Sequence, residues 1–170
     1  QAKTHYTSGN VLSNLLKSYK IGLLTLIIRK SFLQKLEFSF NPSLHFVGDF
    51  DLIIRLSSIC KMGRTNEYLS IYRIHKNNES LKDLEKQINE IELWYFEMKN
   101  NKKISNNSNF KYIYYKILYL RGMKHILNKQ KSKVLHFYYQ LPYNKMKIKL
   151  LLALLMPLSL LKKIKNYSAN

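Results

Sequence analysis

The alternation of hydrophobic and polar positions divides the chain into helical and strand-like stretches. Hydrophobic residues recur every three or four positions over residues 11–19, 49–60, 81–99 and 110–128, which predicts helices that each bury one face. Residues 21–29 instead form a continuous run of β-prone residues, typical of a strand in a sheet covered on both faces. The first part of the chain is therefore predicted to combine helix and strand.

A short strand-like run over residues 68–72 follows the helix that is predicted from Asp49 onward. Asp49 stands where an N-cap belongs, and Gly63 follows the helix as a C-terminal glycine does. A carboxylate at an N-cap accepts backbone N–H bonds and lies at the positive end of the helix dipole. The run after the helix leads into Arg73 and His75, so we expect a carboxylate, a guanidinium and an imidazole at one cleft.

The two acids of this helix, Asp49 and Asp51, allow three interpretations. They can be no more than a cap and a first-turn acid. An acid-x-acid pair also holds a divalent metal in many nucleotide-sugar enzymes, but oxygen-rich metal sites want carboxylates that converge from a strand end or a loop, and this pair opens a helix. A general base needs only one ionised carboxylate aimed into a cleft. That role therefore fits the pair better than metal binding.

Two motifs in this region resemble those of the family 2 glycosyltransferases, which have the GT-A fold. The first is Gly-Asp-Phe-Asp-Leu-x-x-Arg-Leu and the second is Glu-Tyr-Leu-x-x-Tyr-Arg-x-His-x-x-Asn-x-Ser. The resemblance covers residues 8–80, with both motifs in the family's order, although Gly48 stands where the family usually has Glu. It implies an α/β fold in which residues 1–80 are the C-terminal part of a GT-A (Rossmann-like) catalytic domain, followed by a mainly α-helical basic tail.

The resemblance also implies an activity and a set of roles. The enzyme would be an inverting hexosyltransferase that moves a sugar from a nucleotide-sugar donor to a glycan or lipid-linked acceptor in the biosynthesis of bacterial cell-surface polysaccharide. Asp49 would be the base, and Asp51 would contact the acceptor or support the base from behind. Arg73 and His75 would lie near the diphosphate or a Mg²⁺ or Mn²⁺ ion, with His75 as a metal ligand. Alternatively, Arg73 belongs to a surface pair on a strand and His75 is a bystander.

The donor-binding part of such an enzyme is not visible in the sequence. Neither a strand-end Asp-x-Asp nor a first βαβ unit is found, and the chain begins with Gln. We therefore expect a fragment whose donor-binding half lies upstream, inactive if these 170 residues are the whole chain. The family resemblance places residues 21–29 on the acceptor side. Gly22 and Thr25 are then expected near the substrate, unless Gly22 only bends the backbone.

Charge is divided unequally along the chain. All ten acidic residues lie between Glu37 and Glu97, whereas 16 of the 29 Lys and Arg residues lie from Lys99 onward. Such a field favours anionic partners, either phospholipid head groups or nucleic acid. Because no recognisable nucleic-acid motif accompanies the basic residues, an anionic membrane surface is the expected partner and nucleic acid is not.

The second half of the chain is predicted to be helical and basic. Residues 81–99 are expected to form an amphipathic helix, residues 100–109 a linker, and residues 110–170 a basic helical tail. A Leu-rich stretch flanked by lysines is too short to span a bilayer, so residues 146–165 are expected to lie on a membrane surface. A buried helix that closes the domain is the alternative. The first reading places the protein in the cytoplasm, peripheral at the inner face of the membrane.

Two functions of other classes stay open on the sequence. One is a basic, Tyr-rich helical module that binds nucleic acid or membrane. The other is a catalytically inactive remnant that lacks the donor-binding half. The single cysteine, Cys60, falls on a helical pattern and is expected to be a core thiol, not a nucleophile.

Overall fold

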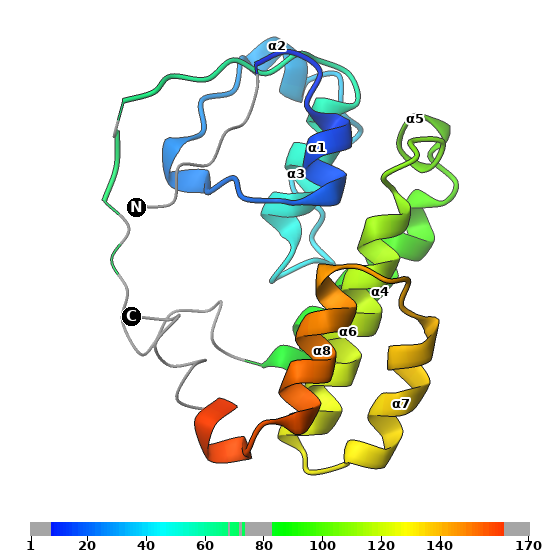
Figure 1. The fold of residues 1–170 in the computed structure, drawn as a ribbon. Helices are drawn as coiled ribbons and strands as arrows, with labels where there is room; N and C mark the ends of the chain where they lie inside the picture. Colours follow the sequence, from blue (N-terminus) through cyan, green and yellow to red (C-terminus); the bar gives the residue numbers. More distant parts are fainter. Residues whose placement is uncertain (1–7, 68, 72, 74–82, 162–170) are drawn as a thin grey trace. The chain divides into compact units, whose positions relative to one another are not determined.

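The computed structural model describes residues 8–67, 69–71, 73 and 83–161 (Figure 1). The chain divides into two compact units. One consists of Gln1–Arg73 with Leu93–Ile113, and the other of Ile74–Glu92 with Tyr114–Asn170. In chain order the helices are α1 (Leu12–Lys17), the short 3-10 helix η1 (Leu23–Thr25), α2 (Lys30–Leu33), α3 (Gly48–Ser57), α4 (Leu84–Met98), α5 (Lys102–Ser105), α6 (Lys111–Leu127), α7 (Lys131–Gln140) and α8 (Lys145–Leu155).

The predicted α/β fold, as the C-terminal part of a GT-A (Rossmann-like) domain, is wrong: the described residues are helical and form no sheet. Their only β-type pairing is an isolated antiparallel bridge between Gly9 and Met62. Residues 21–29, predicted as a buried strand, contain η1 and leave the side chain of Ile27 93% exposed. A strand needs a neighbouring strand to satisfy its N–H and C=O groups, and the described part of the chain offers none to this run.

The second predicted strand gives no sheet either. Residues 69–71 are not in a strand, and Tyr68 and Tyr72 lie outside the described residues. Ile71 is almost fully exposed, as an unpaired β-prone residue is when no facing layer covers it.

The first unit is built around α3. Nearly every residue of this helix is buried, including Leu52, Ile53 and Ile54. A helix that is apolar around most of its circumference has to be enclosed by other elements, and α1 packs against it. Trp94 of α4 completes this core, with its side chain fully buried. The helix predicted from Asp49 onward is thus confirmed, but it begins at Gly48 and ends at Ser57, so the prediction of Gly63 as its C-terminal glycine is wrong.

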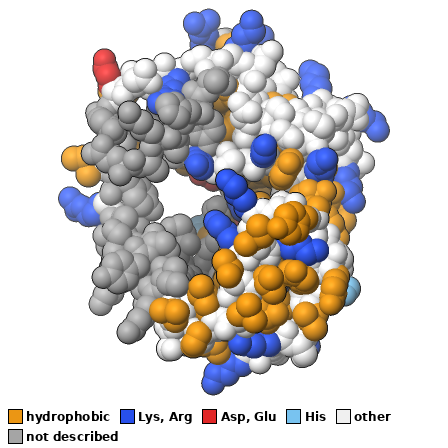
Figure 2. Space-filling view, in the orientation of Figure 1, with side chains coloured by type: hydrophobic (Ala, Val, Ile, Leu, Met, Phe, Trp, Pro, Cys, Tyr) orange, Lys and Arg blue, Asp and Glu red, His pale blue; other side chains and the backbone are white. Residues whose placement is uncertain are grey.

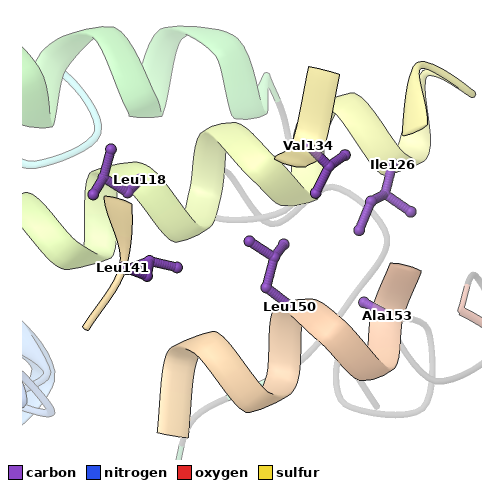
Figure 3. Packing of buried hydrophobic residues seen from close by; sticks show 6 residues of the cluster. All are labelled: Leu118, Ile126, Val134, Leu141, Leu150 and Ala153. Atoms are coloured by element: carbon purple, nitrogen blue, oxygen red, sulfur yellow. The ribbon is translucent and has the colours of Figure 1, made fainter. Parts of the chain in front are cut away.

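The second unit is a helical core formed by α6, α7 and α8, together with the N-terminal part of α4. Figure 3 shows one cluster of its buried residues, namely Leu118, Ile126, Val134, Leu141, Leu150 and Ala153. Helices α6 and α8 approach closely where Gly122 faces Leu150, since a Cβ on Gly122 would lie only 2.8 Å from Leu150 Cδ2. The basic tail therefore has a packed interior of its own, and α7 and α8 contact each other.

An ion-pair network ties α4 to α6 inside the second unit. Arg121 Nε donates to Glu92 Oε1 at 2.8 Å, and its Nη1 donates to Glu85 Oε1 at 2.9 Å. Its Nη2 also donates to Asn89 Oδ1 at 2.8 Å, so three residues on one face of α4 hold one guanidinium. The hydrogen bond to Glu92 raises the pKa of Arg121 above its ordinary value.

The predicted boundaries of the second half agree with the helices in most places. The helices expected over 81–99 and 110–128 appear as α4 and α6. The stretch 100–109, expected to be a linker, contains α5 and buries Ile104 completely. Helix α8 ends at Leu155, so it covers the first part of the surface helix expected over 146–165, while residues 162–165 lie outside the described residues.

Candidate functional site

The N-terminal turn of α3 carries both acids that the sequence singled out. Val47 is the N-cap and makes no side-chain capping bond, so the predicted N-cap role of Asp49 is wrong by two positions. Asp49 lies inside the first turn, where it is half-buried, and its Oδ1 accepts a hydrogen bond of 2.6 Å from the N–H of Phe50. A carboxylate in this turn lies at the positive end of the helix dipole.

Asp51 lies in the core and is bound on several sides. Arg55 Nε donates to its Oδ1 and Oδ2 at 3.0 and 2.9 Å, and Arg55 Nη2 donates to Oδ2 at 2.5 Å. The indole Nε1 of Trp94 donates to Oδ1 at 2.9 Å. With 1% exposure, Asp51 is closed to a substrate. Of its two predicted roles, contact with the acceptor does not fit this buried position. Support for Asp49 from behind stays a prediction.

Arg55 links this acid to the loop that precedes α3. Its Nη1 donates to the carbonyl of Phe38 at 2.7 Å, and its Nη2 donates to the carbonyl of Ser39 at 2.8 Å. The guanidinium also lies 4.5 Å from the centre of the Phe38 ring. A buried charge is tolerated only when it is paired and its hydrogen bonds are satisfied, and here the carboxylate and two carbonyls satisfy the guanidinium. The loop and the first turns of α3 are thereby held together.

Phe50 fixes the turn between the two acids. Its ring meets Trp94 edge-on with centroids 4.6 Å apart, and Tyr19 edge-on at 5.1 Å. Edge-to-face aromatic pairs add to the stability that burial alone gives. The residue directly after Asp49 is therefore immobilised from two sides, which limits the positions that the Asp49 carboxylate can adopt.

Arg73 and His75 are the other predicted site residues. Arg73 is exposed, and His75 lies outside the described residues. The structure thus brings Asp49 and Asp51 into one helical turn. The expected positions of Arg73 and His75 near them stay predictions. No three His, Cys, Asp or Glu side chains gather as a metal site within the described residues. The metal-ligand role of His75 stays a prediction.

The first unit contains a cavity of about 650 Å³. The two sequence motifs gave no indication of it. Gly22 and Thr25, expected near a substrate, are among its lining residues, but Asp49 is not. Its wall is largely apolar, with Leu15, Phe32 and Leu56 among the contributors. Four basic residues also line it, together with a single acid, Glu67; the basic residues are Lys20, Arg29, Lys61 and Arg64.

Cys60 also lines this cavity. Burial raises the pKa of its thiol, and the nearby Lys35 opposes this shift only in part. Its Sγ donates to the carbonyl of Leu56 at 3.2 Å. A nucleophilic cysteine needs a lowered pKa, so the structure agrees with the expectation of a packing thiol.

Comparison with known proteins identified no relative of this chain. No family model, no curated protein and no solved structure matches the chain. The geometry of the residues and the two sequence motifs are therefore the basis for a functional conclusion.

Proposed function

We propose that this chain carries the acceptor-side residues of a family 2 glycosyltransferase, which moves a sugar from a nucleotide-sugar donor to a glycan or lipid-linked acceptor. The observation that carries the proposal is the contrast between the two acids of α3. Asp51 is buried and fully bound, whereas Asp49, two positions earlier, is only half-buried on the same rigid turn. One acid thus has a structural task, and the other is partly exposed to solvent.

The proposed step is an inverting single displacement. The Asp49 carboxylate takes the proton of an acceptor hydroxyl, and the hydroxyl oxygen forms a bond to the anomeric carbon of the donor sugar. The bond from that carbon to the diphosphate breaks, and its electron pair leaves with the nucleoside diphosphate. Asp49 needs only a fixed position and a carboxylate form for this role, and the first turn of α3 supports both.

The leaving diphosphate needs positive charge nearby. Mg²⁺ or Mn²⁺, with Arg73 and His75, is expected to provide it. The described residues do not themselves gather a set of metal ligands, so no step proposed here passes through a metal. Surface-polysaccharide assembly is the expected setting and rests on the sequence resemblance alone.

The test is sugar transfer by the protein as its own cells produce it, in the wild-type form and as the Asp49→Asn variant. Labelled nucleotide sugars, Mg²⁺ or Mn²⁺, and membranes from the cells that make the protein supply donor, metal and acceptor. Loss of a general base lowers the rate by about 10²- to 10⁴-fold. Glu37→Gln is the matched control, because it also removes one negative charge but from an exposed loop position. Transfer at the wild-type rate by Asp49→Asn, or no transfer by the wild type with any donor, would overturn the proposal.

A further inference from the structure

Helix α8 has two apolar faces, and the other described residues pack against only one of them. Leu150 and Ala153 point into the core of the second unit. Exposed hydrophobic residues follow the opposite side of the helix at the i, i+3, i+4 and i+7 positions, namely Ile148, Leu151, Leu152 and Leu155. The side chain of Leu155 is 72% exposed. A single core would need only the first face, so the second stripe is unexplained by the packing of the described residues.

Helix α7 and the loop after it expose hydrophobic residues as well. Leu135 and Tyr139 lie one turn apart on α7, and Tyr143 follows in the loop. Tyr139 and Tyr143 are 74% and 88% exposed. In Figure 2 hydrophobic side chains gather over α7 and α8, with Lys and Arg side chains among and around them. We call these seven exposed residues the hairpin face.

The charges around the hairpin face are all positive. Residues 128–161 contain no Asp or Glu and six lysines, which are Lys129, Lys131, Lys133, Lys145, Lys147 and Lys149. At 100° per residue, Lys145 and Lys149 lie on one side of the exposed stripe of α8 and Lys147 on the other. Lys147 Nζ donates to the carbonyl of Leu141 at 2.8 Å and lies over the Tyr138 ring. Lys145 and Lys149 are exposed and can meet an outside anion.

The geometry points to an anionic lipid surface as the occupant of the hairpin face. Aliphatic residues would enter the boundary between head groups and acyl chains, tyrosines would lie at the level of the head groups, and lysines would meet lipid phosphates. Helix α8 has 11 residues, a length of roughly 16 Å. None of the described helices is long and apolar enough to cross a membrane. Helix α8 therefore lies along the surface.

Other occupants fit the same residues less well. The core of a protein interface is poor in lysine, whereas lysines border this stripe on both sides. Single-stranded nucleic acid is held by aromatic stacking, but most of the hairpin face is Leu and Ile. The inference goes beyond sugar transfer, since it concerns residues remote in sequence from Asp49 and needs no donor or acceptor sugar.

Vesicle binding by the full chain tests the proposal in the absence of any nucleotide sugar. The vesicles are phosphatidylcholine alone or phosphatidylcholine mixed with phosphatidylglycerol. We expect binding only to the mixed vesicles, weakened at least about tenfold in the double variant Leu152→Gln/Leu155→Gln. Lys145→Gln/Lys149→Gln should weaken vesicle binding by about 25-fold, because each lysine contributes roughly fivefold.

The control double variant is Leu93→Gln/Phe96→Gln, which removes two exposed hydrophobic side chains from α4. It should bind as the wild type does. Circular dichroism verifies that each variant keeps its helices. Equal binding to both vesicle types would overturn the proposal, and so would wild-type binding by the Leu152/Leu155 variant. A third contrary result would be that the wild type does not bind vesicles but forms a dimer, and that the Leu152/Leu155 variant does not form this dimer. A negative result in vesicle binding does not affect the test of Asp49, because that test measures sugar transfer.

Discussion

Asp49 and Asp51 are only two positions apart on α3, yet their surroundings differ. At 100° per residue they point to nearly opposite sides of α3. Asp51 meets Arg55 and Trp94 in the core, whereas Asp49 stays at the edge, next to the N–H of Phe50. The family resemblance gives them different roles, but the burial of Asp51 in the core becomes visible only in the packing.

Asp51→Asn should destabilise the fold. Asn keeps the shape but leaves the buried Arg55 without its counter-charge, and breaking a buried ion pair costs about 3–5 kcal/mol. Because the two carbonyl partners of Arg55 remain, we expect a loss of about 3 kcal/mol in the free energy of unfolding, measured with urea. Asp83→Asn is the control: Asp83 accepts the N–H of Lys86 at the start of α4, a bond that Asn can also accept. Equal stability of the two variants would contradict the account.

Cys60 should be slow to react and sensitive to pH. A pKa raised by burial means that the folded chain holds the thiol proton more tightly than the unfolded chain does. The associated stability is complete below the ordinary thiol pKa of about 8.5 and is lost as pH rises through the raised value. We expect iodoacetamide to modify the native chain more slowly than the urea-unfolded chain at mildly alkaline pH. Equal rates would show that the thiol is not shielded.

At the scale of elements, helices were predicted well and strands were not. The periodic patterns over residues 49–60, 81–99 and 110–128 correspond to α3, α4 and α6, because helical hydrogen bonds are local and a helix is specified by its own segment. Residues 21–29 have strand composition, but a strand also needs a partner, which a local pattern cannot provide. Composition therefore predicted the conformational preference of this run but not its structure.

Part of the candidate site was predictable for the same reason. The sequence placed Asp49 and Asp51 at the beginning of a helix, which the structure confirms. It did not indicate that Trp94, 43 positions after Asp51, donates to its carboxylate. Nor did it indicate the cavity lined by basic residues, whose contributors are scattered from Val11 to Leu69. Contacts between distant segments leave no periodic signal, although the lone Trp on the apolar face of a predicted helix was a hint of a core position.

The contact between α6 and α8 predicts an unusual response to a helix-favouring change. Gly122→Ala should raise helix propensity by about 1 kcal/mol. The added Cβ would lie 2.8 and 2.9 Å from the two Cδ atoms of Leu150, which is fully buried and has little room to move. Overpacking costs about 1–3 kcal/mol, so we expect a net loss of roughly 1 kcal/mol in urea unfolding.

The double variant Gly122→Ala/Leu150→Ala checks the cause. Shortening Leu150 removes the crowding, so the double variant should lose less stability than the sum of the two single variants. A Gly122→Ala protein more stable than the wild type would show that α6 and α8 lie further apart than the structure has them.

At the scale of the whole molecule, the acidic residues and the excess positive charge lie in different parts of the sequence. The acids that bind within the protein, such as Asp51, Glu85 and Glu92, all precede residue 98, and they hold Arg55 and Arg121 in internal ion pairs. Beyond residue 97 the chain has only positively charged side chains, so none of them has an acid in its own segment to pair with. In the proposal for the hairpin face on α7 and α8, an anionic membrane is the external partner of this excess charge.

Parallel measurement of sugar transfer and of urea unfolding for Asp49→Asn and Asp51→Asn tests the central claim most directly. The account predicts that Asp49→Asn lowers the transfer rate by about 10²-fold or more, while its free energy of unfolding changes by no more than about 0.5 kcal/mol. Asp51→Asn should lose about 3 kcal/mol of stability. An Asp49→Asn protein that transfers sugar at the wild-type rate, or one that loses activity only because it unfolds, would contradict the assignment of Asp49 as the base.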